Sequence, residues 1–179
     1  MAKNVCLVVG CHPCYKEDMD LALASYPDAK ICAVNFATQL VRCDYLATVH
    51  GDLIPKFLEV YEHDNQPVIF QQDNDTTGDI GTKVAIPTHG GSGPYAAACM
   101  ILQGFDLAIM CGCPIIGTGG YAQKAYFTKG WIRQKHGLVR KWINGMCEYK
   151  ETHPDIANKI RSMSGNTKDI FGGLDDITH

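Results

Sequence analysis

One glycine-rich run in this chain has the residue types and spacing to bind an anion. Residues 88–94 contain three glycines and lead directly into the apolar stretch 95–102. A glycine-rich turn at the start of a helix presents several backbone N–H groups at the positive end of the helix dipole, which suits a phosphate or carboxylate. We therefore predict Gly91, Ser92 and Gly93 as ligand-binding residues, with Ser92 also as the helix N-cap. The alternative is a small-residue helix packed closely on a sheet.

Three histidines are candidates for acid–base chemistry. His12, His50 and His89 each follow an expected strand or lie in a turn. Because an imidazole titrates near neutral pH, each could act as a general base. We predict His89 and His50 as the candidate catalytic bases, and a hydrogen-bonded structural histidine is the alternative for each. Spacing alone defines no Ser-His-Asp or Cys-His arrangement.

The sequence also contains a Cys-x-x-Cys motif, formed by Cys11 and Cys14. A structural zinc site needs four ligands, normally from two such pairs. The other close pair, Cys111 and Cys113, has the wrong spacing. Thioredoxin-like chemistry would place the motif at a helix start. We predict no metal site and no cofactor, and we expect packed or loop cysteines rather than redox chemistry.

Short apolar runs alternate with helical patterns, and these elements must position the candidate residues. The expected strands are residues 4–9, 29–34, 45–49, 68–71, 84–86 and 107–111, and the expected helices are 16–26, 53–61 and 95–102. One or two further helices are expected within 121–150, interrupted by Gly130, Gly137 and Gly145, and residues 160–167 are expected to reach a polar turn. The alternation predicts an α/β, Rossmann-like fold, with a mostly parallel sheet flanked by helices. We expect one domain over residues 1–179.

Polar residues or glycines follow the carboxyl ends of these strands. They include Gly10, Asn35, His50, Gln71 and Gly112. In open α/β sheets, ligands bind at this edge. The full dinucleotide fingerprint and the Walker phosphate motif are both absent from the sequence, so the motifs indicate no standard nucleotide cofactor.

Composition excludes some partners. The chain has 179 residues, 46% of them hydrophobic, and a net charge of −3, which gives no general attraction to nucleic acid or anionic membranes. It has no apolar run of the roughly 18–20 residues that a membrane span needs and no signal-peptide pattern. Cysteines within apolar runs are typical of a reducing compartment, so we expect a cytoplasmic protein with no membrane partner and no direct nucleic-acid binding.

Basic residues at 124–141 form either a solvated helix face or part of a wall around an anion. Aromatic residues at 121–142 form either core or the interface of a homo-oligomer.

Four blocks, residues 7–13, 31–36, 91–112 and 159–167, together resemble small phage-encoded glycosyltransferase-like proteins. More distantly, they are similar to bacterial sialyltransferases that use a CMP-sugar and to the archaeal pterin diphosphokinases. The resemblance implies a Rossmann-like fold, a nucleotide or nucleotide-sugar ligand, and a place in the host cytoplasm. The nucleotide contacts of the sialyltransferases match Gly10, His12, Pro13, Asn35, Ser92 and Gly93 in this sequence.

The chain departs from that pattern after the strand at 107–111. The sialyltransferases have an Asp and a Tyr close together there, whereas this chain has residues Cys-Pro-Ile-Ile at 113–116, and Tyr121 is the candidate substitute. Two functions follow from the resemblance. The first is a glycosyltransferase that uses a nucleotide-sugar donor, with His89 or His50 as base. The second is a non-catalytic phage protein that sequesters a nucleotide-derived signal of host defence. A diphosphokinase-like role is a less favoured third.

Overall fold

The structure, a computed structural model, describes residues 3–73, 80–86, 91–116 and 136–177. Its strands are β1 (Val5–Val9), β2 (Lys30–Val34), β3 (Tyr45–Thr48), β4 (Val68–Gln72), β5 (Thr82–Val84), β6 (Leu107–Cys111) and β7 (Ile160–Ser162). Its helices are α1 (Tyr15–Ser25), α2 (Ile54–Glu59), α3 (Ser92–Leu102), α4 (His136–Thr152), α5 (Pro154–Ala157) and α6 (Gly165–Phe171). Three short 3₁₀ segments are η1 (Asn35–Gln39), η2 (Gly51–Leu53) and η3 (Leu174–Asp176).

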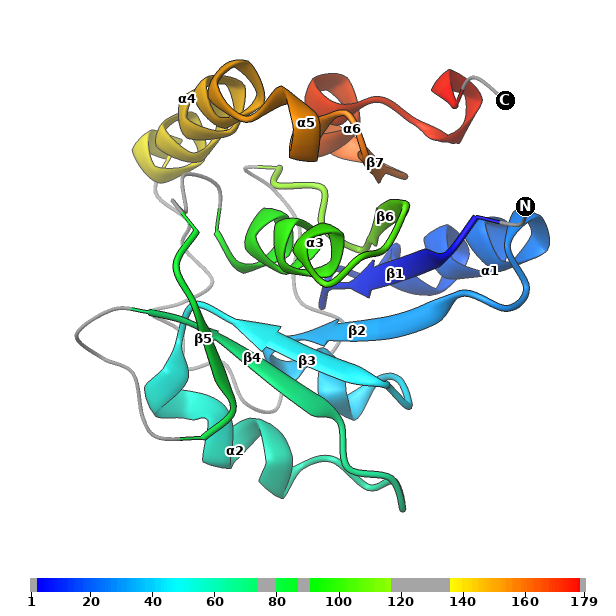
Figure 1. The fold of residues 1–179 in the computed structure, drawn as a ribbon, viewed down its shortest axis with the longest axis vertical. Coiled ribbons are helices and arrows are strands. Elements are labelled where there is room, and N and C mark those ends of the chain that lie inside the picture. Colours follow the sequence, from blue (N-terminus) through cyan, green and yellow to red (C-terminus); the bar gives the residue numbers. More distant parts are fainter. Residues whose placement is uncertain (1–2, 74–79, 87–90, 117–135, 178–179) are drawn as a thin grey trace.

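The strands form one seven-stranded sheet in the order β5-β4-β3-β2-β1-β6-β7 (Figure 1). Every neighbouring pair is parallel, including β1 with β2 and β1 with β6. The fold is therefore a single α/β, Rossmann-like domain, as the sequence predicts. β1 lies near the middle of the sheet, and this explains its uninterrupted apolar sequence, because a central parallel strand is covered on both faces.

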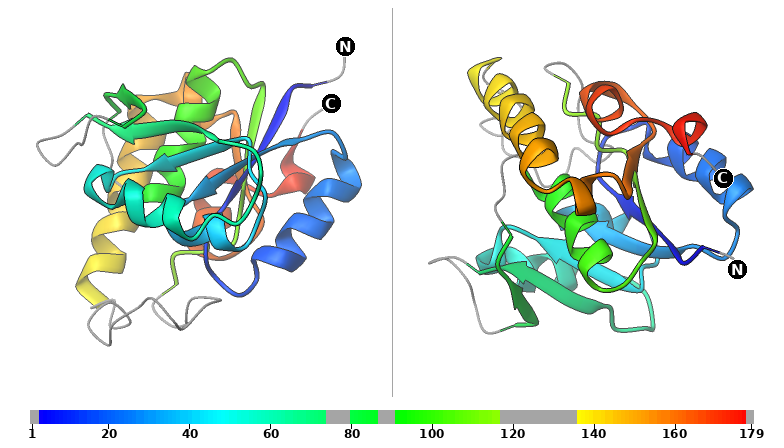
Figure 2. Two further views of the ribbon diagram at one scale, coloured as in Figure 1. Left: turned by 90° about the horizontal axis from the view of Figure 1, so that it is seen from below. Right: turned by 45° about the horizontal axis from the view of Figure 1, so that its top comes forward.

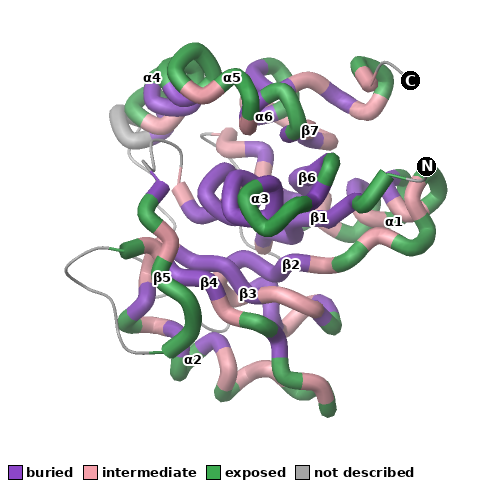
Figure 3. The backbone as a smooth tube through the Cα atoms, viewed as in Figure 1, coloured by how far each residue is buried: buried purple, intermediate pink, exposed green. Residues whose placement is uncertain are grey.

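Helices cover both faces of the sheet (Figure 2). Alternate residues of β1 point to opposite faces, so Cys6 and Val8 join the cluster under α3, while Leu7 and Val9 join the cluster under α1. The part of α4 that holds Met146 packs on the α3 side. Figure 3 shows the deepest burial in α3, β1 and β6, so these three elements form the centre of the core.

Two boundary predictions for strands and helices are corrected. The fifth strand covers Thr82–Val84 rather than 84–86, because its pairing with β4 places Val84 opposite Gln72 at the carboxyl end. Gly137 and Gly145 do not interrupt helices, since both lie inside α4. The surrounding residues of α4 bury one side against the core, and this packing outweighs the low helix propensity of glycine. The predicted helix residues 121–135, with Gly130, lie outside the described part of the chain.

The helix start and the C-terminal region also differ from the sequence prediction. Gly91, not Ser92, is the N-cap of α3, and its φ of +81° is a conformation that favours glycine. Ser92 is the first helical residue. Residues 160–167, expected only to reach a polar turn, contain all of β7 and the start of α6. β7 is three residues long, too short for an alternating pattern to reveal it.

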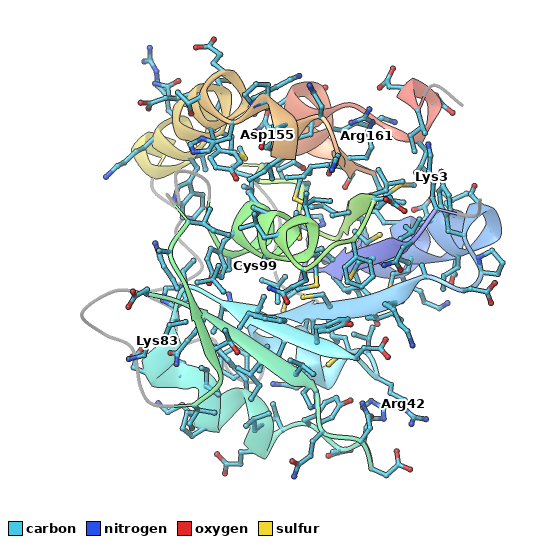
Figure 4. All side chains as sticks on the ribbon, viewed as in Figure 1. Lys3, Arg42, Lys83, Cys99, Asp155 and Arg161 are labelled. Carbon is cyan, nitrogen blue, oxygen red and sulfur yellow. The ribbon has the colours of Figure 1, made fainter. Side chains whose placement is uncertain are left out.

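All nine cysteines are free thiols, and several lie in the core. Figure 4 shows sulfur atoms between α3, where Cys99 is labelled, and the sheet. Burial raises the pKa of Cys99 to about 12 and that of Cys11 to about 12, so both stay protonated at neutral pH. The helices in the described residues are all too short or too polar to cross a bilayer.

Candidate functional site

The order of strands reverses between β1 and β6. The chain adds β2 to β5 on one side of β1 and then returns to place β6 on its other side. In open parallel sheets, the loops that leave the two strands at such a point diverge and open a crevice for ligands. The site predicted at the carboxyl edge is therefore centred on the loops that follow β1 and β6.

These two loops pack directly on each other through glycines. The N–H of Gly10 donates to the carbonyl of Cys111 over 2.8 Å, and the N–H of His12 donates to the carbonyl of Gly112 over 3.2 Å. A Cβ on Gly10 would lie 2.5 Å from the Gly112 oxygen and 2.6 Å from Cys113 Sγ. Close packing of the loops thus already requires glycine at position 10, and its contact with a ligand stays a prediction.

Gly112 is fixed by a second steric constraint. Its φ is +66°, and an added Cβ would lie 2.5 Å from the Cβ of Tyr15 on α1. Only a residue without a side chain therefore lets the turn after β6 pass over the start of α1. As at Gly10, the packing explains the glycine without a ligand.

The start of α3 lies beside the same pair of loops. A Cβ on Gly93 would lie 3.0 Å from Cys113 Sγ, and one on Gly91 would lie 4.0 Å from the ring of Trp142 on α4. Among the described residues, no side chain caps the helix, and its first turn contains no acidic residue. Three predicted ligand residues, Gly10, Gly93 and Gly112, are therefore brought together around Cys113, with the N-terminal end of α3 next to them.

Asn35 and His50 belong to a second part of the same edge, at the ends of β2 and β3. The Thr48 hydroxyl donates to Asn35 Oδ1 over 2.6 Å, and the His50 N–H donates to the Thr48 hydroxyl oxygen over 2.9 Å. Asn35 has a positive φ of 54°. Burial lowers the pKa of His50, with Asp52 opposing this effect, so the imidazole is neutral at pH 7. A neutral imidazole can accept a proton, but its catalytic role stays a prediction.

Asp18 was not predicted from the sequence as a residue of the site, although its buried carboxylate contacts these loops. Asp18 on α1 is 6% exposed. Its Oδ2 accepts hydrogen bonds from the Gly112 N–H at 2.8 Å, the Ser164 hydroxyl at 2.9 Å and the Cys14 thiol at 3.4 Å. One side chain therefore connects α1, the loop after β6 and the loop after β7.

The sequence does carry a signal for Asp18. The residue lies three positions after Tyr15 and four before Ala22, and both of these pack on the cluster under α1. An acidic residue on the apolar side of a helix is expected to have buried hydrogen-bond partners. The partners themselves could not be identified, because Gly112 and Ser164 are 94 and 146 residues away.

The C-terminal segment supports the loop after β6 from the other side. The Thr167 hydroxyl donates to the Cys113 carbonyl at 2.8 Å, and the Asn166 amide donates to the Ile115 carbonyl at 2.6 Å. Ile115 has a φ of 46°, which is strained for a β-branched residue. The predicted site is thus built partly by residues 164–167, which the resemblance includes but to which the sequence assigned no role.

His12 and Cys14 lie together where the chain enters α1. His12 Nδ1 is 3.0 Å from Cys14 Sγ and also accepts the Cys14 N–H at 3.3 Å. Burial lowers the pKa of His12, and Asp18 partly opposes this. Burial also raises the pKa of Cys14, so a neutral imidazole faces a protonated thiol at pH 7. Pro13, between them, is exposed.

Two predicted site residues, His89 and Tyr121, lie outside the described part of the chain. Within residues 3–73, 80–86, 91–116 and 136–177, no group of three or more His, Cys, Asp or Glu side chains is arranged to hold a metal ion. No protein-family model, no curated protein and no solved structure matches this chain.

Proposed function

We propose that this protein binds a nucleotide-derived small molecule at the carboxyl edge of its sheet, beside the loops after β1 and β6 and at the start of α3. The observation that supports this proposal is the position of the N-terminal end of α3 beside the two loops at which the strand order reverses. The first turn of α3 adds backbone N–H groups and the positive end of a helix dipole, which suit a phosphate group.

Two fates of the ligand follow from this proposal. In a glycosyltransferase, His50 or His89 deprotonates an acceptor hydroxyl, which attacks the sugar carbon, and the N–H groups of α3 stabilise the departing phosphate. In a sequestering protein, the same groups hold the ligand intact. One observation favours sequestration. The sialyltransferases that the sequence resembles have an acid and a tyrosine after the strand that corresponds to β6. In this chain Pro114 is buried at that place, and a Cβ on Gly165 would lie 2.5 Å from the Pro114 carbonyl oxygen.

Ligand recovery separates the two fates. The protein is incubated with nucleotides, nucleotide sugars, and cyclic or ADP-ribose-derived nucleotides, and binding is detected as a rise in melting temperature. Bound material is then released by heat and identified by mass spectrometry. Intact ligand in stoichiometric amount supports sequestration, whereas free nucleotide plus a transferred or hydrolysed group supports the enzyme. No stabilisation by any of these compounds would contradict the proposal.

A substitution in α3 tests the position of the site. A bulky residue at Gly93 is unsuitable, because a Cβ alone already approaches Cys113 Sγ to 3.0 Å and the fold would be disturbed. Ser92→Ala removes only a hydroxyl in the first turn and is expected to weaken ligand binding by up to about tenfold. Ser25→Ala, at the exposed end of α1, is the matched control and should leave the affinity unchanged. Equal affinity in both variants would exclude Ser92 from the site.

A further inference from the structure

We propose that Cys14 is a nucleophile and that His12 accepts its proton, so that this pair reacts with an electrophilic carbon that carries a leaving group. The pair lies at the carboxyl edge of the sheet, but the inference does not require a nucleotide ligand.

The geometry places the thiol next to a base. Cys14 Sγ lies 3.0 Å from His12 Nδ1, and both residues are half-buried, so a small reagent can reach them. Cys14 immediately precedes α1, a helix of eleven residues. The positive end of that helix stabilises a thiolate that forms there.

The hydrogen bonds also fix the form of His12. Because Nδ1 accepts the Cys14 N–H, the proton of the neutral ring is on Nε2. Nε2 is buried and has no hydrogen-bond partner among the described residues. A buried donor without a partner is destabilising, and an acceptor atom of a bound substrate would satisfy it. This unpaired donor is an observation separate from the thiol, and it too indicates a ligand.

Two further groups contact the thiol. Asp18 Oδ2 and Ser164 Oγ each lie 3.4 Å from Cys14 Sγ. Asp18 favours a protonated His12 and disfavours a thiolate on Cys14. The pair therefore rests as thiol and neutral imidazole, and the proton moves only as the sulfur attacks. This is general-base catalysis rather than a preformed ion pair.

Iodoacetamide is the simplest probe of this chemistry. The Cys14 sulfur forms a bond to the methylene carbon, the carbon–iodine bond breaks, and iodide leaves with its electron pair. The thiol hydrogen, which is donated to Asp18 Oδ2 in the resting state, rotates to His12 Nδ1, and the imidazole takes the proton as the sulfur attacks and then releases it to solvent. Mass spectrometry of peptides measures the alkylation rate of Cys14 separately from that of Cys147, the exposed cysteine of α4.

The test compares wild type with His12→Asn, since the Asn side-chain oxygen can still accept the Cys14 N–H but is not basic. This variant is expected to lower the Cys14 rate by about tenfold or more, with the Cys147 rate unchanged. His153→Gln, a change in a histidine that stacks on Tyr149 at the end of α4, is the matched control and should change neither rate. An unchanged Cys14 rate in a folded His12→Asn protein would overturn the proposal.

The pH profile of wild type provides a second test that does not depend on the variant folding. The titratable groups that face the pair are Asp18 on α1 and the thiols Cys111 and Cys113, both kept protonated by burial. The Cys14 rate is expected to fall as pH drops through the lowered pKa of His12 and to be level above it. A rate that simply increases tenfold per pH unit up to the raised pKa of the thiol would mean that hydroxide, not His12, removes the proton, and would overturn the proposal.

Discussion

At the residue scale, Asp18 stabilises the predicted site more directly than any residue that the sequence singled out. Its buried Oδ2 accepts hydrogen bonds from three different segments of the chain. Hydrogen bonds to a charged acceptor are stronger than those between neutral groups. The position of the loop after β6 therefore depends on one carboxylate in the first turn of α1.

Replacing this carboxylate tests that dependence. Asp18→Asn keeps the shape but removes the charge, and an amide hydrogen can then face the Gly112 N–H. We expect the free energy of unfolding to fall by about 2–4 kcal/mol in urea denaturation. Asp20→Asn on the same helix is the control, because Asp20 is exposed and its ion pair with Lys16 is solvated. Equal stability of the two variants would show that the Asp18 network contributes little.

The half-buried His50 at the edge makes stability depend on pH. The pKa of His50 in the folded protein lies below its ordinary value of 6.5, because burial disfavours the imidazolium. Between the lowered pKa and 6.5 the unfolded chain binds a proton that the folded chain does not, so stability is lost as pH falls from about 6.5 through the lowered pKa of the folded state. His50→Gln is expected to reduce this slope in denaturation curves across that range. His63→Gln, at an exposed position, is the control, and an equal effect of both would contradict the assignment.

At the element scale, the loop after β6 depends on α6. The Thr167 hydroxyl is fully buried, donates to the Cys113 carbonyl and lies 2.7 Å from the Ser162 hydroxyl. These bonds hold a loop that contains the strained Ile115. The C-terminal helix is therefore a structural support of the candidate site, although it is remote in sequence.

Thr167→Val removes the hydroxyl with little change of shape. We expect a loss of about 1–3 kcal/mol in the free energy of unfolding and faster amide hydrogen exchange in residues 112–116. Thr152→Val is the matched control, since Thr152 is exposed at the end of α4 and, among the described residues, its hydroxyl bonds within its own turn and to His153. If hydrogen exchange in residues 112–116 is the same in both variants, α6 does not support this loop.

The sequence predicts the strands much better than the contacts between loops. β1 and β6 are visible because a buried parallel strand is a continuous apolar run, as in Leu107–Cys111. The fold class and the glycine-rich start of α3 follow from the same local patterns. The Asp18 bonds to Gly112 and Ser164 join residues 94 and 146 positions apart, and local periodicity carries no information on such pairs. The prediction of Ser92 as the N-cap was wrong, because the positive φ of Gly91, rather than the capping preference of a serine side chain, determines where α3 begins.

At the scale of the whole molecule, the sheet order concentrates the candidate residues at one place. Parallel strands send all their carboxyl ends to one edge, and the reversal between β1 and β6 separates the helices that follow them. Among the described residues, those that the sequence or the structure assigns to the site do not lie at the opposite edge of the sheet. Binding should therefore affect one edge of the domain and leave the rest unchanged.

Hydrogen exchange with and without a ligand from the thermal-shift panel measures this directly. At a ligand concentration of 100 times Kd, binding to the folded state alone stabilises it by about 2.7 kcal/mol. Hydrogen exchange that requires global unfolding therefore slows everywhere in the core. Beyond that uniform effect, we expect extra protection in residues 10–15, 91–95 and 112–116, which surround the convergence of the two loops with α3. Residues of α2 are internal controls, because α2 lies away from β1 and β6 (Figure 1). Extra protection confined to α2 would place the ligand elsewhere and contradict the site.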